Sequence, residues 1–228
     1  MKIVAFTGAG ISKESGIDTY RDKGGLWEKN NPEEVATADG WKKDKKKVLD
    51  FYNLLRGKLK DYQPNKAHEL LAKLGEKHDL TIITQNVDDL HERAGSKKIL
   101  HLHGELNKMR STGTNRIYDC DKDIHVGSLC PQNHQLRPHL VFFGELPFNV
   151  EESYKTLEDC DLLLIIGTSL NITYTLEMLS SINEEKTSVI YIDPNPDDFM
   201  DGITEVEYIK KPATEGVAEI YNGLIKIE

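Results

Sequence analysis

Four short polar or glycine-rich segments stand out as places where a nucleotide could bind. Each directly follows an apolar run with the length of a buried strand, and they span residues 8–12, 85–88, 167–169 and 193–195. Ligands of open α/β sheets bind beyond the carboxyl ends of the strands. Any one segment alone fits an ordinary helix cap or turn. Their joint placement favours one nucleotide site at a single edge of a sheet.

The first of these segments resembles a phosphate-binding turn. Gly8 and Gly10 match the first two glycines of the dinucleotide fingerprint, but Lys13 occupies the position of the third. Small residues let the backbone approach a pyrophosphate, and a helix that begins near Gly10 would direct its free N–H groups at the phosphates. The glycine spacing alone fits a plain strand-to-helix turn equally well.

Three histidines near this edge could handle a proton. His103 follows a strand and precedes Gly104, which favours an open position for the ring and a role as general base. His91 and His101 are candidates of the same kind. Each of the three could instead be structural, and spacing alone does not choose among them.

Short apolar strands alternate with amphipathic helices along the chain. This alternation predicts an α/β fold built on a doubly wound, mostly parallel, Rossmann-like sheet. Strands are expected at residues 2–6, 80–84, 99–103, 138–143, 161–167, 188–193 and 206–209. Helices are expected at residues 48–60, 65–75, 151–158, 172–182 and 214–226, with a short helix ending near residue 94.

Two segments interrupt the alternation. No strand with an acidic end arrives about 20 residues after the glycines, where a dehydrogenase would need one. Residues 28–78 are therefore expected to be a helical insertion, and the polar, turn-rich residues 106–137 a small inserted subdomain. Residues 1–27, 79–105 and 138–228 are expected to form the Rossmann-like core of one catalytic domain spanning 1–228.

Composition excludes several classes of protein. The formal net charge of the 228 residues is −9, which argues against general nucleic-acid binding. No apolar run is long enough to span a bilayer, and the first residues lack the pattern of a secretory signal. Three cysteines do not make a disulfide framework. A cytoplasmic location without a membrane partner is expected.

Six motifs occur in the order typical of sirtuins, and the chain resembles this family of NAD-dependent protein-lysine deacylases from about Lys2 to the last helix. The motifs are GAGIS at 8–12, GI at 16–17 with YR at 20–21 and GLW at 25–27, TQNVD at 84–88 with LH at 90–91 and AG at 94–95, HG at 103–104, Pro138 with FGE at 143–145, and GTSL at 167–170.

The resemblance implies a role for each motif. His103 would be the general base, and Asn86 and Asp88 would hold the ribose and the nicotinamide. The other NAD contacts would come from Gly8, Ala9, Gly10, Ser12, Tyr20, Arg21, Trp27, Gln85, Gly167, Thr168, Ser169, Asp193, Asn195 and Ala213. The substrate peptide would add as a strand bordered by Val141, Phe143, Gly144 and Glu145.

The reaction implied by the resemblance yields nicotinamide, O-acyl-ADP-ribose and free lysine. Two alternatives stay open: an NAD glycohydrolase or ADP-ribosyltransferase, and a non-catalytic NAD-binding module. His103 argues against the first, because the deacylation steps are those that require the base. Retention of Asn86 and Asp88 beside His103 argues against the second.

The acyl group is less well specified. Asp18-Thr19 replaces the common Pro-Asp and resembles the branch that removes acidic acyl groups, which also carries Tyr-x-x-Arg on the helix lining the acyl pocket. Tyr52 matches the tyrosine, but Leu55 stands at the arginine position, and Arg56 lies about 100° further round the helix. These three are the candidate acyl contacts, and deacetylation or removal of longer apolar groups is expected at least as much as desuccinylation.

This chain also lacks the ligand pattern of the structural zinc that most sirtuins bind. Such a site needs two Cys-x-x-Cys pairs. Only Cys120 and Cys130 lie in this region, and His125 and His134 would complete four ligands at an unconvincing spacing. The zinc module is therefore expected to be reduced or lost, and no metal ligand is assigned. Tyr174 replaces a proline of the motif after GTSL, which predicts a shift in helix entry.

Overall fold

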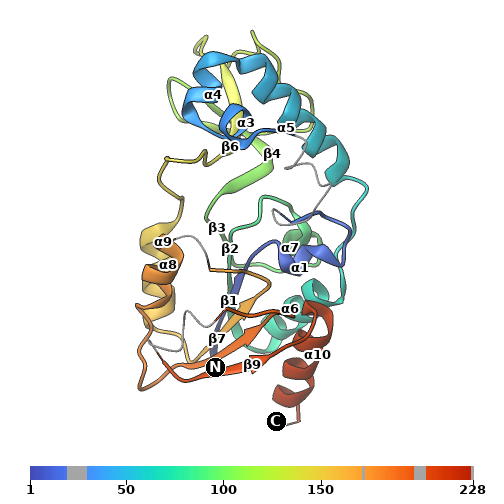
Figure 1. Ribbon diagram of the computed structural model, residues 1–228, viewed down its shortest axis with the longest axis vertical. Helices are drawn as coiled ribbons and strands as arrows, with labels where there is room; N and C mark the ends of the chain where they lie inside the picture. Colours follow the sequence, from blue (N-terminus) through green and yellow to red (C-terminus); the bar gives the residue numbers. More distant parts are fainter. Residues whose placement is uncertain (20–29, 171–172, 198–203, 227–228) are drawn as a thin grey trace.

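Six parallel strands form the main sheet of the computed structural model, which describes residues 1–19, 30–170, 173–197 and 204–226 (Figure 1). Their order is β3-β2-β1-β7-β8-β9, the doubly wound order of dinucleotide-binding sheets. The predicted fold class is therefore confirmed. The strands are β1 (Lys2–Thr7), β2 (Asp79–Thr84), β3 (Ile99–His101), β7 (Leu162–Ile166), β8 (Ser188–Ile192) and β9 (Val206–Ile209).

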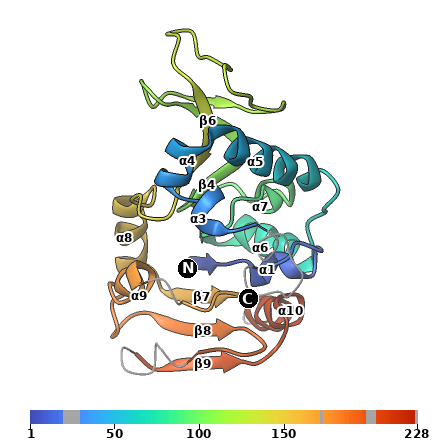
Figure 2. The ribbon, with the colours of Figure 1, turned by 45° about the horizontal axis from the view of Figure 1, so that its top comes forward.

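Helices bury both faces of this sheet (Figure 2). Along β1, Ile3 and Ala5 join one apolar cluster while Val4 and Phe6 join the other, as the two-residue period of a strand requires. The first cluster is covered by α6 (Lys66–Lys77) and α10 (Ala213–Leu224), and the second by α8 (Val150–Glu158) and α9 (Thr173–Leu179). Burial on both sides explains why the central strands are continuously apolar.

A smaller module lies beyond one end of the main sheet, at the top of Figure 1. Its antiparallel sheet has the order β5-β4-β6 and packs with three helices around a third apolar cluster. The elements are β4 (Gly104–Ser111), β5 (Ile117–Asp119), β6 (Leu136–Leu140), α3 (Pro32–Val35), α4 (Ala38–Lys43) and α5 (Lys45–Leu59).

Two expectations need correction. The strand expected at 138–143 is β6, which pairs antiparallel with β4 in the small module rather than extending the main sheet. The range 28–78 was expected to be an insertion, but its last helix, α6, packs against the main sheet. The predicted boundary at 78 therefore wrongly assigns α6 to the insertion, and the boundary at 138 wrongly assigns most of β6 to the Rossmann-like core. That residues 1–228 act as one catalytic domain stays a prediction.

The chain leaves the main sheet at Gly104. Its φ is +84°, and a β-carbon there would collide with the carbonyl oxygen of His139 on β6. Glycine adopts this conformation at little cost, and other residues rarely do. The strand expected at 99–103 consequently ends at His101. Over the described part of the chain, no helix combines the length and the apolar character needed to cross a bilayer.

Candidate active site

The loops after β1 and β7 meet at the point where the sheet topology changes direction. The Gly8 N–H donates to the Ile166 carbonyl oxygen over 3.0 Å, and the Gly10 N–H donates to the Gly167 carbonyl oxygen over 2.7 Å. A β-carbon on Gly10 would lie 2.6 Å from the Gly167 α-carbon. The glycines are thus needed for contact between two loops, which the fingerprint alone did not indicate. Nucleotides bind at such a switch point.

Ala9 and Ser12 lie in this same turn. Ala9 is the N-cap of α1 (Gly10–Lys13), and Ser12 is fully buried within it. The turn is fastened to α6, because the Asn65 side chain donates to the Ile11 carbonyl oxygen over 2.7 Å while capping α6. The start of the predicted nucleotide site is therefore held by α6, a helix about 50 residues further along the chain.

Ser12 joins the two polar residues that follow β2. The Asn86 amide donates to Ser12 Oγ over 3.1 Å, and Ser12 Oγ donates to Asp88 Oδ2 over 3.0 Å. Asp88 Oδ1 accepts from the Leu90 N–H at 3.1 Å. Burial raises the pKa of Asp88. We call this the Asn86–Ser12–Asp88 chain; it brings together residues predicted at two different strand ends.

Beneath this chain lies a buried support that includes one of the candidate histidines. Thr84 Oγ1 accepts from the Asn86 N–H at 3.0 Å and from the Thr7 hydroxyl at 2.8 Å. His91 Nε2 lies 3.1 Å from Thr7 Oγ1. The His91 ring is 1% exposed, and burial keeps its pKa well below the ordinary value. His91 is therefore a structural histidine.

His103 has the properties of a base. Its Nδ1 lies 2.7 Å from the Gln85 carbonyl oxygen, and because a carbonyl only accepts, Nδ1 carries the proton. Nε2 of the neutral ring is then free to accept, and the Tyr174 hydroxyl donates to it. Burial lowers the pKa of His103, so the ring is neutral at neutral pH. A neutral ring with its lone pair on a fixed nitrogen suits general-base catalysis.

Gln85 also connects β2 to the loop after β7. The Thr168 hydroxyl donates to Gln85 Oε1 over 2.7 Å, and the Thr168 carbonyl oxygen accepts from the Tyr191 hydroxyl at 2.5 Å. Gly167 and Leu170 on either side of this loop have φ of +59° and +51°. Thr168 is thus fixed both by the loop after β2 and by β8, and it holds the loop that contains Ser169.

The residues expected around adenosine lie further along the same edge. After β8, the Asn195 N–H donates to Asp193 Oδ1 over 2.8 Å. Ala213 is the first residue of α10 and is 5% exposed. Its neighbour Thr214 is tied to the first loop, because the Glu14 carboxylate accepts from the Thr214 N–H at 3.0 Å. Tyr20, Arg21 and Trp27 lie outside the described residues.

The predicted acyl contacts on α5 differ in what they face. Tyr52 is buried, and its ring is stacked with Phe142, with ring centroids 6.0 Å apart. Leu55 packs against the same apolar cluster of the small module. Arg56 is 4% exposed; its Nε donates to the Leu106 carbonyl oxygen over 2.7 Å. Its Nη1 donates to Asn53 Oδ1 over 2.8 Å.

Arg56 is therefore held within the small module, and its role as a substrate contact stays a prediction. Its guanidinium is directed into the small module, where it fastens α5 to β4. Burial also lowers the pKa of Arg56. From the sequence, only the angle of Arg56 on the helix can be inferred, and this angle does not reveal which partners the long side chain reaches.

The loop after β6 is anchored on one side and open on the other. The Val141 N–H donates to the His103 carbonyl oxygen over 2.9 Å, and the Phe143 N–H donates to the Ala36 carbonyl oxygen over 2.8 Å. The Phe143 side chain is 58% exposed and that of Leu146 is 86% exposed. Gly144 between them has a φ of +87°. Leu146 was not among the predicted residues.

Glu145 holds this loop from inside. Its carboxylate accepts from Arg137 Nη1 at 2.8 Å, from Arg110 Nη2 at 3.1 Å and from the Phe142 N–H at 2.9 Å. Burial raises the pKa of Glu145, but the hydrogen bonds from Arg137 and Phe142 outweigh it and hold the pKa below the ordinary value. Arg137, which sequence reasoning missed, is thus a partner of a predicted residue.

The residues at the expected zinc position do not form a ligand set. Cys120 Sγ donates to the Lys122 carbonyl oxygen over 3.2 Å, and Cys130 Sγ lies 3.3 Å from Ser111 Oγ. Both cysteines are buried in the apolar cluster of the small module. Within the described ranges, no three of Cys120, Cys130, His125 and His134 place ligand atoms around a common point. The loss of zinc stays a prediction.

Known proteins resemble the chain over nearly its whole length. The Sir2 family model matches residues 8–174. An NAD-dependent protein deacylase of Helicobacter pylori (strain J99) is 49% identical over 193 residues, which cover 84% of this chain and 82% of that protein. An NAD-dependent protein deacylase of Bacteroides thetaiotaomicron is 41% identical over 230 residues, which cover 98% and 97% of the two chains.

Solved structures agree with these relatives. A Sir2 homolog in complex with NAD superimposes with a TM-score of 0.88 at 35% identity, covering 99% of this chain and 90% of that one. A Sir2 structure with a deacetylated p53 peptide and 3'-O-acetyl ADP ribose gives a TM-score of 0.79 at 28% identity, covering 97% and 92%. By its sequence and its fold, this chain belongs to the Sir2 family.

Proposed function

We propose that His103, Asn86 and Asp88 are the catalytic residues of this chain, which is an NAD-dependent protein deacylase. The observation that carries the proposal is the state of the His103 ring. Its Nδ1 proton is held by the Gln85 carbonyl oxygen, and its Nε2 is an acceptor at the carboxyl edge of the sheet. The same Gln85 precedes Asn86 directly, so the base and the Asn86–Ser12–Asp88 chain are positioned by one short loop.

The residues present suit NAD as the cosubstrate. Bound NAD supplies a ribose that accepts the acyl group and a nicotinamide that departs. Gly8, Ala9 and Gly10 with residues 167–169 lie at the switch point, where a pyrophosphate would be held. Asp193, Asn195 and Ala213 lie further along the edge, toward the adenosine half. Tyr20, Arg21 and Trp27 complete the proposed set.

His103 removes a proton from a ribose hydroxyl in this proposal. The proton moves to Nε2, while the Gln85 carbonyl stabilises the imidazolium that forms. The Tyr174 hydroxyl occupies that nitrogen in the structure, so it must move aside before the ribose can take its place. Asn86 and Asp88 orient the nicotinamide amide, and the buried position of Asp88 excludes water from that contact.

The substrate peptide is proposed to lie along the loop after β6. Exposed Phe143 and Leu146 offer apolar contacts, and Glu145 keeps the loop in place from inside. Among the predicted acyl contacts, Tyr52 and Leu55 belong to an apolar cluster, while the charge of Arg56 is used elsewhere. We therefore propose a preference for acetyl or longer apolar acyl groups over succinyl.

One assay tests the function against its rivals. The protein is incubated with NAD and peptides that carry acetyl-, succinyl- or long-acyl-lysine, and the products are analysed. Acyl-ADP-ribose that disappears in His103→Ala supports the proposal. ADP-ribose formed without any peptide would indicate a glycohydrolase instead, and NAD binding without turnover of any peptide would indicate a binding module.

The remaining expectations about cell context also stay proposals. The three cysteines are free and buried, which is consistent with a reducing compartment such as the cytoplasm. Acylated lysines on proteins are the proposed partners, and no nucleic-acid or membrane partner is proposed.

A further inference from the structure

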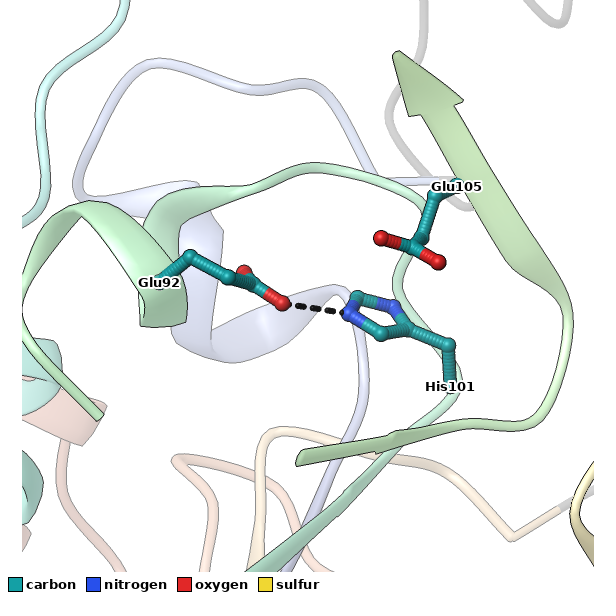
Figure 3. A group of neighbouring side chains, drawn as sticks. All are labelled: Glu92, His101 and Glu105. Atoms are coloured by element: carbon teal, nitrogen blue, oxygen red, sulfur yellow. Dashed lines mark hydrogen bonds and ion pairs between the residues drawn. The ribbon is translucent and has the colours of Figure 1, made fainter. Parts of the chain in front are cut away.

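Three titratable side chains from three elements meet beside the proposed nicotinamide site. They are Glu92 of α7 (Leu90–Arg93), His101 at the end of β3, and Glu105 of β4 (Figure 3). Their ligand atoms all lie within 4.8 Å of one another. The His101 side chain is almost completely buried, whereas Glu92 reaches the surface. The proposed catalysis does not use any of the three directly.

The hydrogen bonds of His101 fix its proton count. Nε2 lies 2.7 Å from Glu92 Oε1, and Nδ1 lies 3.2 Å from the Asn86 carbonyl oxygen. An ionised carboxylate and a carbonyl oxygen can only accept. A neutral imidazole has one N–H, so one of the two contacts would set a lone pair against an acceptor. Both contacts are satisfied together only when the ring carries two protons.

Groups on every side of the ring bear on this state. Burial opposes the charge, but Glu92 and Glu105 outweigh it and raise the pKa of His101. Glu105 also pairs with Lys108, whose Nζ lies 3.0 Å from Glu105 Oε2. The charge of His101 in turn acts against the burial that raises the pKa of Asp88 and adds to the burial that lowers the pKa of His91. Arg93 of α7 is paired with Asp89, at 3.6 Å.

The second contact of the ring leads straight to the active site. The carbonyl that His101 binds belongs to Asn86, whose side chain starts the Asn86–Ser12–Asp88 chain. We propose that His101 is a positioning residue: a protonated imidazolium, held by Glu92 and Glu105, that fixes the Asn86 backbone and thereby the side chains that orient nicotinamide. This rests on the proposed function of Asn86 and Asp88.

The same proton count argues against a metal ion at this cluster. A metal ligand must offer a lone pair, and both nitrogens of the doubly protonated ring are committed to hydrogen bonds. The three side chains are therefore assigned to an ion-paired histidine and not to a cation site.

The protonation state is tested without catalysis. In the full chain labelled with ¹⁵N-histidine, NMR is expected to show both His101 nitrogens protonated at a pH where histidines of an unfolded peptide are neutral. Glu92→Gln is expected to lower the pKa of His101, whereas Glu76→Gln, at an exposed site of α6, leaves it unchanged. A neutral His101 in the parent protein at that pH, or displacement of its protons by added Zn²⁺, would overturn the proposal.

The positioning role is tested by kinetics. His101→Gln is expected to raise KM for NAD and lower kcat/KM for NAD about tenfold, the size of one charged hydrogen bond, with KM for the peptide unchanged. As the pH rises through the range in which NMR shows His101 losing its proton, kcat/KM for NAD is expected to fall in the parent and in Glu76→Gln. It stays level in His101→Gln, which has no such proton to lose.

Equal pH profiles in the parent and His101→Gln would contradict the role, even if the NMR result held. If no acyl peptide is turned over at all, the proposed function fails on its own. NAD binding measured by calorimetry across the same pH range then still tests whether His101 positions Asn86.

Discussion

The two cores of this protein stabilise their buried polar groups in different ways. At the edge of the main sheet, short neutral or carboxylate side chains bond to one another, as in Thr7 to Thr84 and Ser12 to Asp88. In the small module, long cations reach main-chain oxygens and a single carboxylate, as Arg56 and Arg137 do. The first arrangement places reactive groups accurately; the second fastens a helix to a strand through Arg56 and holds the loop after β6 through Arg137.

This difference has a physical origin. Parallel strands end at one edge, so short side chains on neighbouring strand ends are already within hydrogen-bond distance. The small module has three antiparallel strands and long turns, whose carbonyl groups need donors that come from further away. An arginine supplies several donors on a long stem and can also stack on aromatic rings, as Arg137 does 3.7 Å above the Phe142 ring.

The largest effect is expected from a substitution that removes the general base at the edge of the main sheet but leaves the fold intact. Replacing His103 with alanine should lower kcat for deacylation about 10³-fold, because the base is lost. The midpoint of thermal unfolding should stay close to that of the parent. Steady-state kinetics with an acetyl-lysine peptide and a thermal melt measure the two. A loss of stability as large as the loss of rate would show that the ring is structural.

The opposite outcome is expected for the small module. Arg56→Met should reduce the free energy of unfolding by about 3 kcal/mol, because the Leu106 carbonyl oxygen and Asn53 lose a buried charged donor. Urea unfolding measures the change, with Lys60→Met at an exposed position as the matched control. The ratio of succinyl to acetyl turnover should not change. A changed ratio of succinyl to acetyl turnover would show that Arg56 contacts the acyl group of the substrate.

Acid should weaken the main-sheet core through a buried histidine. Burial lowers the pKa of His68 from 6.5 to about 4, so the unfolded chain binds a proton that the folded chain does not between these values. Stability contributed by neutral His68 is complete above pH 6.5 and is lost as the pH falls toward 4. Urea unfolding should show a decrease of about 2 kcal/mol from this residue between pH 6.5 and pH 5.

The His68→Gln variant provides the comparison for that measurement. Its stability is lower at neutral pH, but its dependence on pH over the same interval should be shallower than that of the parent. Parallel curves for the two proteins would mean that other groups account for the acid sensitivity.

The smallest effect concerns the loop that the small module presents. Glu145→Gln weakens the contacts with Arg110 and Arg137 while keeping the size of the side chain, so the loop at 141–146 is less well held. KM for the peptide should rise about fivefold and KM for NAD should change little. Glu151→Gln, on an exposed turn of α8, is the control. An equal rise in both KM values would argue that the loop does not serve the peptide alone.

How much the sequence could predict differs between the same two regions. The main sheet was predictable because its central strands are buried on both faces, so β1 and β7 contain long apolar runs. The residues at its strand ends followed from topology and from the resemblance to sirtuins. In the small module, the segment at 138–140 carries the same signals whichever sheet it joins, and only the turn at Gly104 directs it to β4.

The three histidines illustrate a further limit. His91, His101 and His103 look alike in the sequence, and they differ only in what their ring nitrogens face. His91 faces a buried hydroxyl, His101 a carboxylate and a carbonyl, and His103 a carbonyl and a hydroxyl. His91 and His103 are neutral, whereas His101 is proposed to carry two ring protons. Such partners come from distant parts of the chain, so no local pattern encodes them.

The junction at His103 and Gly104 has a mechanical consequence. The base sits on the last residue before the chain turns into β4, and its carbonyl oxygen receives the Val141 N–H of the returning strand. The crossing into β4 and the crossing back after β6 are therefore tied together at the same residue. A displacement of the small module at this junction would therefore act on the residue that carries the base, and the peptide loop that begins at Val141 would move with it.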